Sequence, residues 1–338
     1  MSTLGWAVLG CGDITEKRGA PALAAHEACR LVSFQSRTAA RAEEFARRFG
    51  ADRWNTDRDQ VLADPAVQAV YVATEHDRHC ADVIACAEAG KHVLCEKPLA
   101  NSVADCQRMI AACRQAGVAL QVAYYRRYYP KLVRMKELLD AGAIGDPATA
   151  HIHLVSRLDR ERIGPANWRL NAAVSGGGQL VDTGSHRLDL LCWLLGEPDR
   201  VAAFAECREM PIEAPDMETL LIRMARGAHA VTRHGFRTNS PDELSIAGTE
   251  GTLDATPVDG PILRLRTDAR GGPNPRRRHE EEFDLPKHDN VHFPLFDDFT
   301  RRILAGEPPR YTGEDGMQAS RIIEAAYESA RTGRIIPA

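Results

Sequence analysis

Apolar runs of strand length alternate with segments of helical periodicity through the first third of the chain. The strand-length runs are residues 6–9, 31–34, 69–73, 92–94 and 118–122. The segments in which apolar residues recur with helical spacing are 39–49, 77–89 and 102–116. Ser102 is a favourable N-cap for the last of these segments, and Gly117 is the residue that a helix C-terminus favours. This alternation predicts βαβ units, and therefore a doubly wound parallel sheet over residues 1–123.

The pattern changes after residue 123. A helical segment over 131–141 leads into strict apolar-polar alternation over 148–154. Further strand-like segments follow near 200–207, 218–225 and 228–236. Successive strands with few helices between them favour antiparallel pairing, so residues 124–338 are predicted to form an α+β domain on an open, mostly antiparallel sheet.

One polar segment interrupts the second half. Residues 268–282 are rich in glycine and proline, and we expect an exposed loop there. The segment places three arginines beside three glutamates. Such a mixture is more typical of a solvated hairpin than of a phosphate site.

Composition and charge narrow the class of protein. A chain of 338 residues exceeds what one core usually holds, which favours two domains. A net charge of -4 gives no reason to expect nucleic acid or an anionic membrane as a partner. No signal peptide or membrane-spanning apolar run is found, and the nine cysteines lack any Cys-x-x-Cys pair. We therefore expect a cytoplasmic protein with a small-molecule partner, without disulfides and without a metal site.

A glycine-rich turn follows the first strand. Gly10 permits a tight turn, and Gly12 allows the backbone to approach a pyrophosphate at the N-terminus of the next helix. The third small position of this fingerprint holds Thr15. The context predicts a Rossmann dinucleotide-binding domain over residues 1–123, in which Gly10, Gly12, Asp13 and Ile14 contact the cofactor. A plain βα turn is the alternative.

The end of the second strand bears on cofactor choice. An NAD site usually places a carboxylate there, but this chain has none until Glu43. Ser36 and Arg37 can instead donate hydrogen bonds to a 2′-phosphate. We expect NADP, with NAD as the alternative cofactor. If Arg37 is only a solvated loop residue, the site takes either one.

Two further motifs carry candidate chemistry. Glu96, Lys97 and Pro98 follow the strand expected over 92–94, at the sheet edge where open α/β sheets bind ligands. After the triple glycine 176–178, Asp182 and His186 stand four residues apart and so share one helix face. A lone histidine on a helix is more often structural, and the pair alone is only mildly suggestive.

Together these elements resemble the glucose-fructose oxidoreductase, inositol dehydrogenase and rhizopine-catabolism (Gfo/Idh/MocA) family. The order of Gly-x-Gly, Glu96-Lys97-Pro98 and Asp182-x-x-x-His186 carries the resemblance, which covers nearly the whole chain. Supporting matches are residues 70–74 with His79, 90–94, 248–251 and 329–333. The chain departs from the family at Thr15 and at Glu75-His76, where the family commonly has Pro-Asn.

The resemblance implies hydride transfer between a nicotinamide cofactor and a sugar, polyol, inositol or related hydroxylated ring. Lys97 would contact the nicotinamide ribose and the reacting oxygen. His186 would act as general acid/base, and Asp182 would orient it or bind a neighbouring hydroxyl. Whether Lys97 or His186 donates the proton stays open.

The resemblance also implies further contacts and an assembly. Cofactor contacts are expected from Thr74, His76, His79, Glu96 and Lys97. Substrate contacts are expected from Tyr124, Arg126, Trp168, Arg169, Asp182 and His186, with a packed seam between domains as the alternative for the first four. A cis Lys97–Pro98 bond is implied. So is a homodimer or homotetramer through the exposed face of the second sheet.

Two other functions compete with the dehydrogenase. Relatives use a tightly held NAD in redox-neutral glycoside hydrolysis, and a non-enzymatic, dinucleotide-sensing regulator could use the same fold. Retention of Lys97, Asp182 and His186 argues against the regulator, because a pure sensor does not need these residues.

Overall fold

The chain folds into two compact units. A computed structural model describes residues 2–157, 168, 171–207, 214–236, 239, 240, 242–268 and 278–338. The first unit comprises Met1–Tyr125 with His288–Ser320, and the second comprises Arg126–Lys287 with Arg321–Ala338. This division differs from the expected one, which assigned everything after residue 123 to the second domain. The segment His288–Ser320 returns to the first unit.

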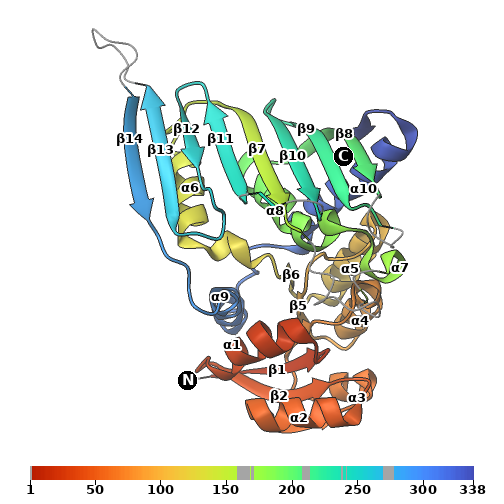
Figure 1. The fold of residues 1–338 in the computed structure, drawn as a ribbon. Coiled ribbons are helices and arrows are strands. Elements are labelled where there is room, and N and C mark those ends of the chain that lie inside the picture. The colour runs from red at the N-terminus through yellow and green to blue at the C-terminus, as the bar shows by residue number, and fades with distance from the viewer. Residues whose placement is uncertain are drawn as a thin grey trace. The chain divides into compact units, whose positions relative to one another are not determined.

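The first unit is built on a six-stranded parallel sheet (Figure 1). Its strands are β1 (Leu4–Leu9), β2 (Cys29–Gln35), β3 (Arg53–Asn55), β4 (Ala69–Val72), β5 (His92–Cys95) and β6 (Leu120–Val122). They lie in the order β3-β2-β1-β4-β5-β6. The strand order reverses direction between β1 and β4, and in such sheets ligands bind beyond the carboxyl ends of the strands at this point. The predicted doubly wound sheet is confirmed.

Helices connect the strands of this sheet much as the periodicity predicts. They are η1 (Thr15–Gly19), α1 (Ala20–Ala24), α2 (Ala39–Phe49), α3 (Arg58–Leu62), η2 (His76–Arg78), α4 (His79–Glu88) and α5 (Val103–Ala116). The Ser102 side chain accepts from the Asp105 amide, and Gly117 is left-handed with φ 68°, so both predicted ends of α5 are confirmed. Sequence periodicity missed β3, which has only three residues, and the short helices before β2.

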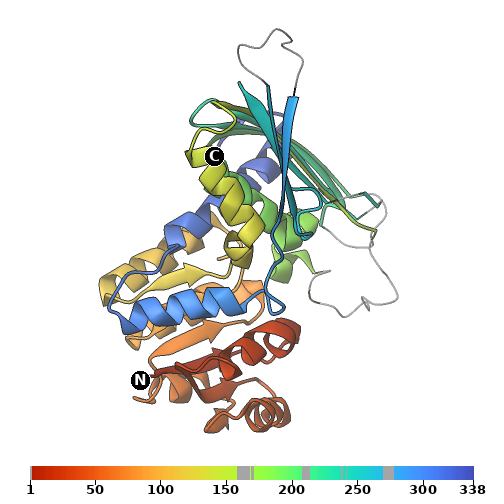
Figure 2. The ribbon, with the colours of Figure 1, turned by 90° about the vertical axis from the view of Figure 1, so that its left-hand side faces the viewer.

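The segment that returns to the first unit contributes a helix to its core. In α9 (Phe293–Leu304), Phe296 packs edge-on against Trp6 of β1 and Tyr71 of β4, with ring centroids 5.5 and 5.1 Å apart. Phe299 lies 5.6 Å from Trp6. Figure 2 shows this helix in blue beside the elements of the N-terminal sheet. The aromatic core explains why this distant segment belongs to the first unit.

The second unit is built on a nine-stranded sheet. Its strands are β7 (Pro147–Val155), β8 (Pro198–Glu206), β9 (Met217–Met224), β10 (His229–Gly235), β11 (Glu243–Gly248), β12 (Gly251–Asp254), β13 (Ile262–Asp268), β14 (Arg278–Asp284) and β15 (Ile336–Pro337). The order is β14-β13-β12-β11-β7-β10-β9-β8-β15, and every pairing except β10 with β7 is antiparallel. The expected mostly antiparallel sheet is confirmed.

Within the described residues, helices pack on one face of this sheet and none packs on the other (Figure 2). The helical elements of the unit are η3 (Tyr125–Tyr128), α6 (Pro130–Asp140), α7 (Ala172–Ser175), η5 (Leu180–Gly184), α8 (Ser185–Leu195) and the second part of α10 (Gly313–Thr332). On the opposite face, Phe204 and Leu221 leave 78% and 54% of their surface exposed. Exposed apolar side chains on an open sheet are a feature of association surfaces.

The predicted loop over 268–282 is wrong at its C-terminal end. Residues Arg278–Asp284 form β14, paired with β13. Cross-strand ion pairs join Arg266 to Glu280 and Arg264 to Glu282, at 3.1 and 3.0 Å. Charged pairs of this kind stabilise an exposed edge hairpin without an apolar pattern, so periodicity did not reveal the strand. The residues between the two strands, 269–277, lie outside the described residues.

The structure contains no disulfide between the cysteines that it describes. Among the described residues, no group of three or more histidine, cysteine or carboxylate side chains could hold a metal ion. In the same part of the chain, no helix is both long and apolar enough to cross a membrane.

The aromatic contact of α9 leads to a stability prediction. Phe296→Ala removes a fully buried ring, so we expect it to lower the free energy of unfolding by about 3–5 kcal/mol. Urea denaturation followed by circular dichroism measures this change. Ile335→Ala, at a side chain that is 63% exposed, is the control and should change stability by less than about 0.5 kcal/mol. Equal effects of the two substitutions would contradict the role of α9 in the core.

Candidate active site

The glycine-rich turn after β1 has the form that a dinucleotide needs. Gly10 has φ 101°, and a Cβ there would lie 2.4 Å from the carbonyl oxygen of Ala73. A Cβ at Gly12 would meet nothing within 4 Å, so this glycine leaves open space beside the backbone. Thr15 donates from Oγ1 to the Gly10 carbonyl at 2.7 Å and closes the turn. The turn therefore fits a pyrophosphate that approaches Gly12.

The glycine that allows the following helix to pack closely on the sheet is Gly19, and not a residue at the third position of the fingerprint. Gly19 lies against the ring of Tyr71, and a Cβ there would come within 2.4 Å of it. Gly19 thus takes the helix-packing role that the fingerprint assigns to its third small residue, and Thr15 is free to bond to Gly10. The expected contacts Asp13 and Ile14 lie at this turn. Asp13 is exposed and pairs with Lys17 at 2.6 Å.

Arg41 of α2 braces the turn, and sequence reasoning missed it. Its Nε donates to the Cys11 carbonyl at 3.1 Å, and its Nη2 donates to Glu16 at 3.0 Å. These partners lie 30 and 25 residues away along the chain, so no local pattern could reveal the contact.

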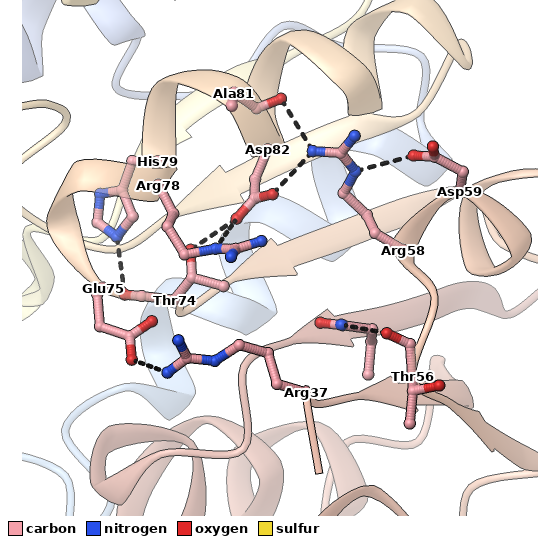
Figure 3. A network of polar contacts seen from close by, with 11 residues as sticks. Arg37, Thr56, Arg58, Asp59, Thr74, Glu75, Arg78, His79, Ala81 and Asp82 are labelled. Carbon is pink, nitrogen blue, oxygen red and sulfur yellow. Dashed lines mark hydrogen bonds and ion pairs between the residues drawn. The ribbon is translucent and has the colours of Figure 1, made fainter. Parts of the chain in front are cut away.

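Ser36 and Arg37 lie beyond the carboxyl end of β2, as expected for residues that select the cofactor. The Ser36 hydroxyl accepts from the Thr38 amide at 3.3 Å. Arg37 is not simply solvated: its Nη2 donates to Oε1 of Glu75 at 2.6 Å (Figure 3). The sequence identified Glu75 only as a departure from the family pattern.

A partly buried network holds the turn between β4 and α4. Thr74 donates from Oγ1 to Asp82 at 2.8 Å, and Arg58 donates to the other oxygen of Asp82 at 3.0 Å (Figure 3). His79 lies between two carbonyl oxygens, 3.1 Å from that of Thr74 and 3.0 Å from that of Pro98. Burial lowers the pKa of His79, and a neutral imidazole donates to only one carbonyl at a time.

The two histidines also have structural surroundings. His79 is fully buried and joins the β4–α4 turn to the turn after β5, and its contact with a cofactor, like that of His76, stays a prediction. His76 is also buried, with its ring 5.6 Å from that of His79. Thr74 remains half-buried at the carboxyl edge of the sheet.

Glu96 anchors the turn that carries Lys97. The Tyr71 hydroxyl donates to Oε1 of Glu96 at 2.6 Å, and the Lys97 amide donates to Oε2 at 3.1 Å. His292 Nε2 donates to Oε1 at 3.3 Å. Burial alone would raise the pKa of Glu96, but the hydrogen bond and charge of His292, together with Lys97 and Tyr71, lower it below its usual value. Glu96 is therefore an ionised, buried anchor.

The Lys97–Pro98 peptide bond is cis, which confirms the family-based prediction. Lys97 itself is half-buried. His292 was missed by sequence reasoning, because it lies 196 residues from Glu96 in the chain. Tyr125 covers its ring, with centroids 4.4 Å apart.

In the second unit the triple glycine allows close packing before the candidate catalytic residues. A Cβ at Gly178 would lie 1.9 Å from the Pro215 carbonyl oxygen. A Cβ at Gly177, whose φ is 156°, would lie 2.5 Å from the Tyr327 hydroxyl. Larger residues would displace the segment that leads into η5.

Asp182 and His186 lie on one continuous helical segment, but it is not regular. Asp182 belongs to η5, a π-helical turn, and His186 to the first turn of α8. The sequence predicts a regular helix here, so the π-helical turn is a difference from that expectation. Single π-helical turns are often found at functional sites. His186 is buried and Asp182 is half-buried.

Two ion pairs fix α8 within the turn that follows His186. Arg187 donates to both oxygens of Asp242, at 2.9 and 2.5 Å. Arg127 donates to both oxygens of Asp189, at 3.0 and 2.6 Å, and both side chains are buried. Bidentate pairs restrict rotation of a helix, so the orientation of His186 follows from them.

The remaining expected substrate residues lie in varied surroundings. Tyr124, in the first unit, is buried. Arg126 donates to both oxygens of Asp259 at 3.1 Å. Burial opposes ionisation of Asp259, but Arg126 lowers its pKa to about 2. Trp168 is half-buried, and Arg169 lies outside the described residues.

Comparison with known proteins identifies the family. Residues 4–124 match a family model described as an oxidoreductase family with an NAD-binding Rossmann fold, and residues 132–254 match the Gfo/Idh/MocA C-terminal domain. A D-xylose 1-dehydrogenase (NADP(+)) of Haloferax volcanii is 30% identical over 335 residues, covering 97% of this chain and 98% of that protein. The chain belongs to the Gfo/Idh/MocA oxidoreductase family. It is an NAD(P)-dependent oxidoreductase.

Two further relatives match along almost the full chain. The 1,5-anhydro-D-fructose reductase of Ensifer adhaerens is 29% identical over 333 residues, which cover 97% of each protein. The crystal structure of an aldose-aldose oxidoreductase from Caulobacter crescentus, complexed with glycerol, matches with a TM-score of 0.87 and 30% identity. That match covers 99% of this chain and 100% of the other.

The buried pair that orients α8 leads to a second stability prediction. Asp189→Ala leaves the charge of Arg127 buried without its carboxylate, so we expect the free energy of unfolding to fall by about 3–5 kcal/mol. The control is Glu137→Ala, which breaks an exposed pair with Arg134 in the same unit and should cost less than about 1 kcal/mol. Urea denaturation of both variants measures the difference. Similar small losses in both would contradict an anchoring role for Asp189.

Proposed function

We propose that this enzyme transfers a hydride between NAD(P) and a carbon that bears a hydroxyl or carbonyl group in a sugar, polyol, inositol or related hydroxylated ring. The main support is that one chain carries both halves of the required chemistry. A lysine follows the buried Glu96 anchor at the same edge of the parallel sheet as the glycine turn, and an aspartate and a histidine lie on a helix fixed by ion pairs. The relatives, among them a D-xylose dehydrogenase and an anhydrofructose reductase, support the substrate class.

We assign the proton chemistry to Lys97, Asp182 and His186. The cofactor supplies or accepts the hydride at nicotinamide C4. The Lys97 ammonium donates to the reacting oxygen, and His186 takes or returns the hydroxyl proton. Asp182 accepts from a neighbouring hydroxyl or orients His186. Lys97 belongs to the first unit and the other two to the second, so their meeting at one substrate oxygen is part of the proposal.

We assign cofactor binding to the carboxyl edge of the parallel sheet. Gly10 and Gly12 allow the pyrophosphate to approach, and the side chains of Ser36 and Arg37 donate to a 2′-phosphate. This set favours NADP over NAD. Thr74 and Lys97 complete the edge near the nicotinamide ribose, and Tyr124, Arg126, Trp168 and Arg169 remain proposed substrate contacts.

We propose that two or four copies associate through the open face of the nine-stranded sheet. Phe204 and Leu221 lie exposed there on neighbouring strands, where a second copy would cover them. We propose a cytoplasmic location. The net charge of -4 supports a small-molecule partner over nucleic acid.

The catalytic assignment predicts a loss of rate with binding retained. Lys97→Ala and His186→Ala should each lower kcat by about 10²- to 10⁴-fold, because each removes a positioned proton donor or acceptor. A panel of aldoses, ketoses, inositols and dihydrodiols, followed at 340 nm with NADP and NAD in both directions, identifies the substrate and measures kcat. Cofactor affinity, measured by fluorescence titration, should stay nearly unchanged. Near-normal kcat in the His186 variant would remove it from the mechanism.

The same assay separates the competing functions. Net change in absorbance at 340 nm with substrate supports the dehydrogenase. Glycoside cleavage without net cofactor turnover would replace it with the redox-neutral hydrolase. Binding of cofactor with no reaction on any substrate would favour the regulator.

The proposed association predicts an effect of charge on the open sheet face. Leu221→Arg places a cation on the apolar part of that face, so we expect sedimentation equilibrium to show a shift from oligomer to monomer. Trp54→Arg, at an exposed apolar side chain on β3 of the first unit, serves as the control and should leave the oligomer intact. An oligomer that survives Leu221→Arg unchanged would place the interface elsewhere.

A further inference from the structure

The partner of Arg37 has consequences for cofactor choice. Arg37 follows β2, and Glu75 follows β4. In the sheet, β1 lies between these two strands. The ion pair between them, 2.6 Å long, therefore spans the end of the sheet at which β1 leads into the Gly10 turn (Figure 3). This is the edge that the dinucleotide occupies in the proposed function.

The carboxylate is the fixed member of the pair. Glu75 directly follows Thr74, which is tied to Asp82 through its hydroxyl and to His79 through its carbonyl. Its side chain is 27% exposed, whereas that of Arg37 is 71% exposed. The arginine has room to turn away, and the carboxylate remains at the cofactor edge.

A carboxylate at this position acts differently on the two cofactors. A 2′-phosphate needs the guanidinium as a hydrogen-bond donor, and Glu75 competes for the same group. The negative charge of Glu75 also repels the negative charge of the phosphate. The 2′-hydroxyl of NAD is neutral and carries no phosphate charge. Glu75 therefore weakens the binding of NAD less than it weakens the binding of NADP.

We propose that Glu75 is a specificity-determining residue that restrains the preference for NADP. It holds Arg37 in an ion pair and places a negative charge near the 2′ position. The assignment rests on the proposed cofactor site. This proposal gives a function to Glu75, the acidic residue at the position where the chain departs from the Pro-Asn pattern of the family.

The test isolates the 2′-phosphate from the rest of the cofactor. Isothermal titration calorimetry with 2′,5′-ADP and with ADP measures the affinity of the wild-type protein and of Glu75→Gln. We expect Glu75→Gln to bind 2′,5′-ADP about threefold to tenfold more tightly, while the affinity for ADP changes less than about twofold. NADP and NAD should show the same difference. Glu88→Gln, at an exposed carboxylate near the opposite end of α4, should change neither affinity.

A double variant tests whether Arg37 transmits the effect. In an Arg37→Gln background, Glu75→Gln should produce a smaller gain for 2′,5′-ADP than in the wild-type background, because the competition is gone. No change in Glu75→Gln, or an equal change for both nucleotides, overturns the inference while the cofactor site stands. Failure of the wild-type protein to bind any of the four nucleotides overturns the site itself, and the inference with it.

Discussion

The buried carboxylate of Glu96 makes the hydrogen bonds on which the first half of the candidate active site depends. It accepts hydrogen bonds from Tyr71 on β4, from His292 at the start of α9 and from the Lys97 amide. A buried charge is costly unless donors surround it, and here three segments supply them. The same contacts that compensate the charge therefore fix the position from which Lys97 leaves the sheet. The aromatic packing of α9 on Trp6 and Tyr71 keeps His292 in place.

In the second unit, ion pairs fix the segment that carries the candidate catalytic histidine. Arg127 with Asp189, and Arg187 with Asp242, fix a helix whose first turn carries His186. Removal of one partner would leave a buried charge uncompensated, so these contacts specify one orientation of the helix. In both units, buried polar contacts hold the segment that carries a candidate catalytic side chain.

At the carboxyl edge of the parallel sheet, where we propose that the cofactor binds, glycines leave open space and an ion pair balances the charge of Arg37. Glycine removes side chains where the backbone turns or where a helix approaches the sheet, and Thr15 closes the turn through its hydroxyl. Arg37, the proposed donor to a 2′-phosphate, is paired with Glu75. Under the proposed function, the affinity for each cofactor depends on the balance of these two opposed charges, which a single substitution can shift.

The sequence by itself determined the alternation of strands and helices in the parallel sheet, the glycine turn and the family. Periodicity and short motifs are local, so they can be read without the fold. Only the tertiary structure decided that His292 bonds to Glu96 across 196 residues, that α9 joins the first unit, and that Arg37 meets Glu75. The structure also has a π-helical turn at Asp182, where the sequence predicts a regular helix. These features depend on packing between segments that are distant in the chain, and local sequence patterns carry no signal of such contacts.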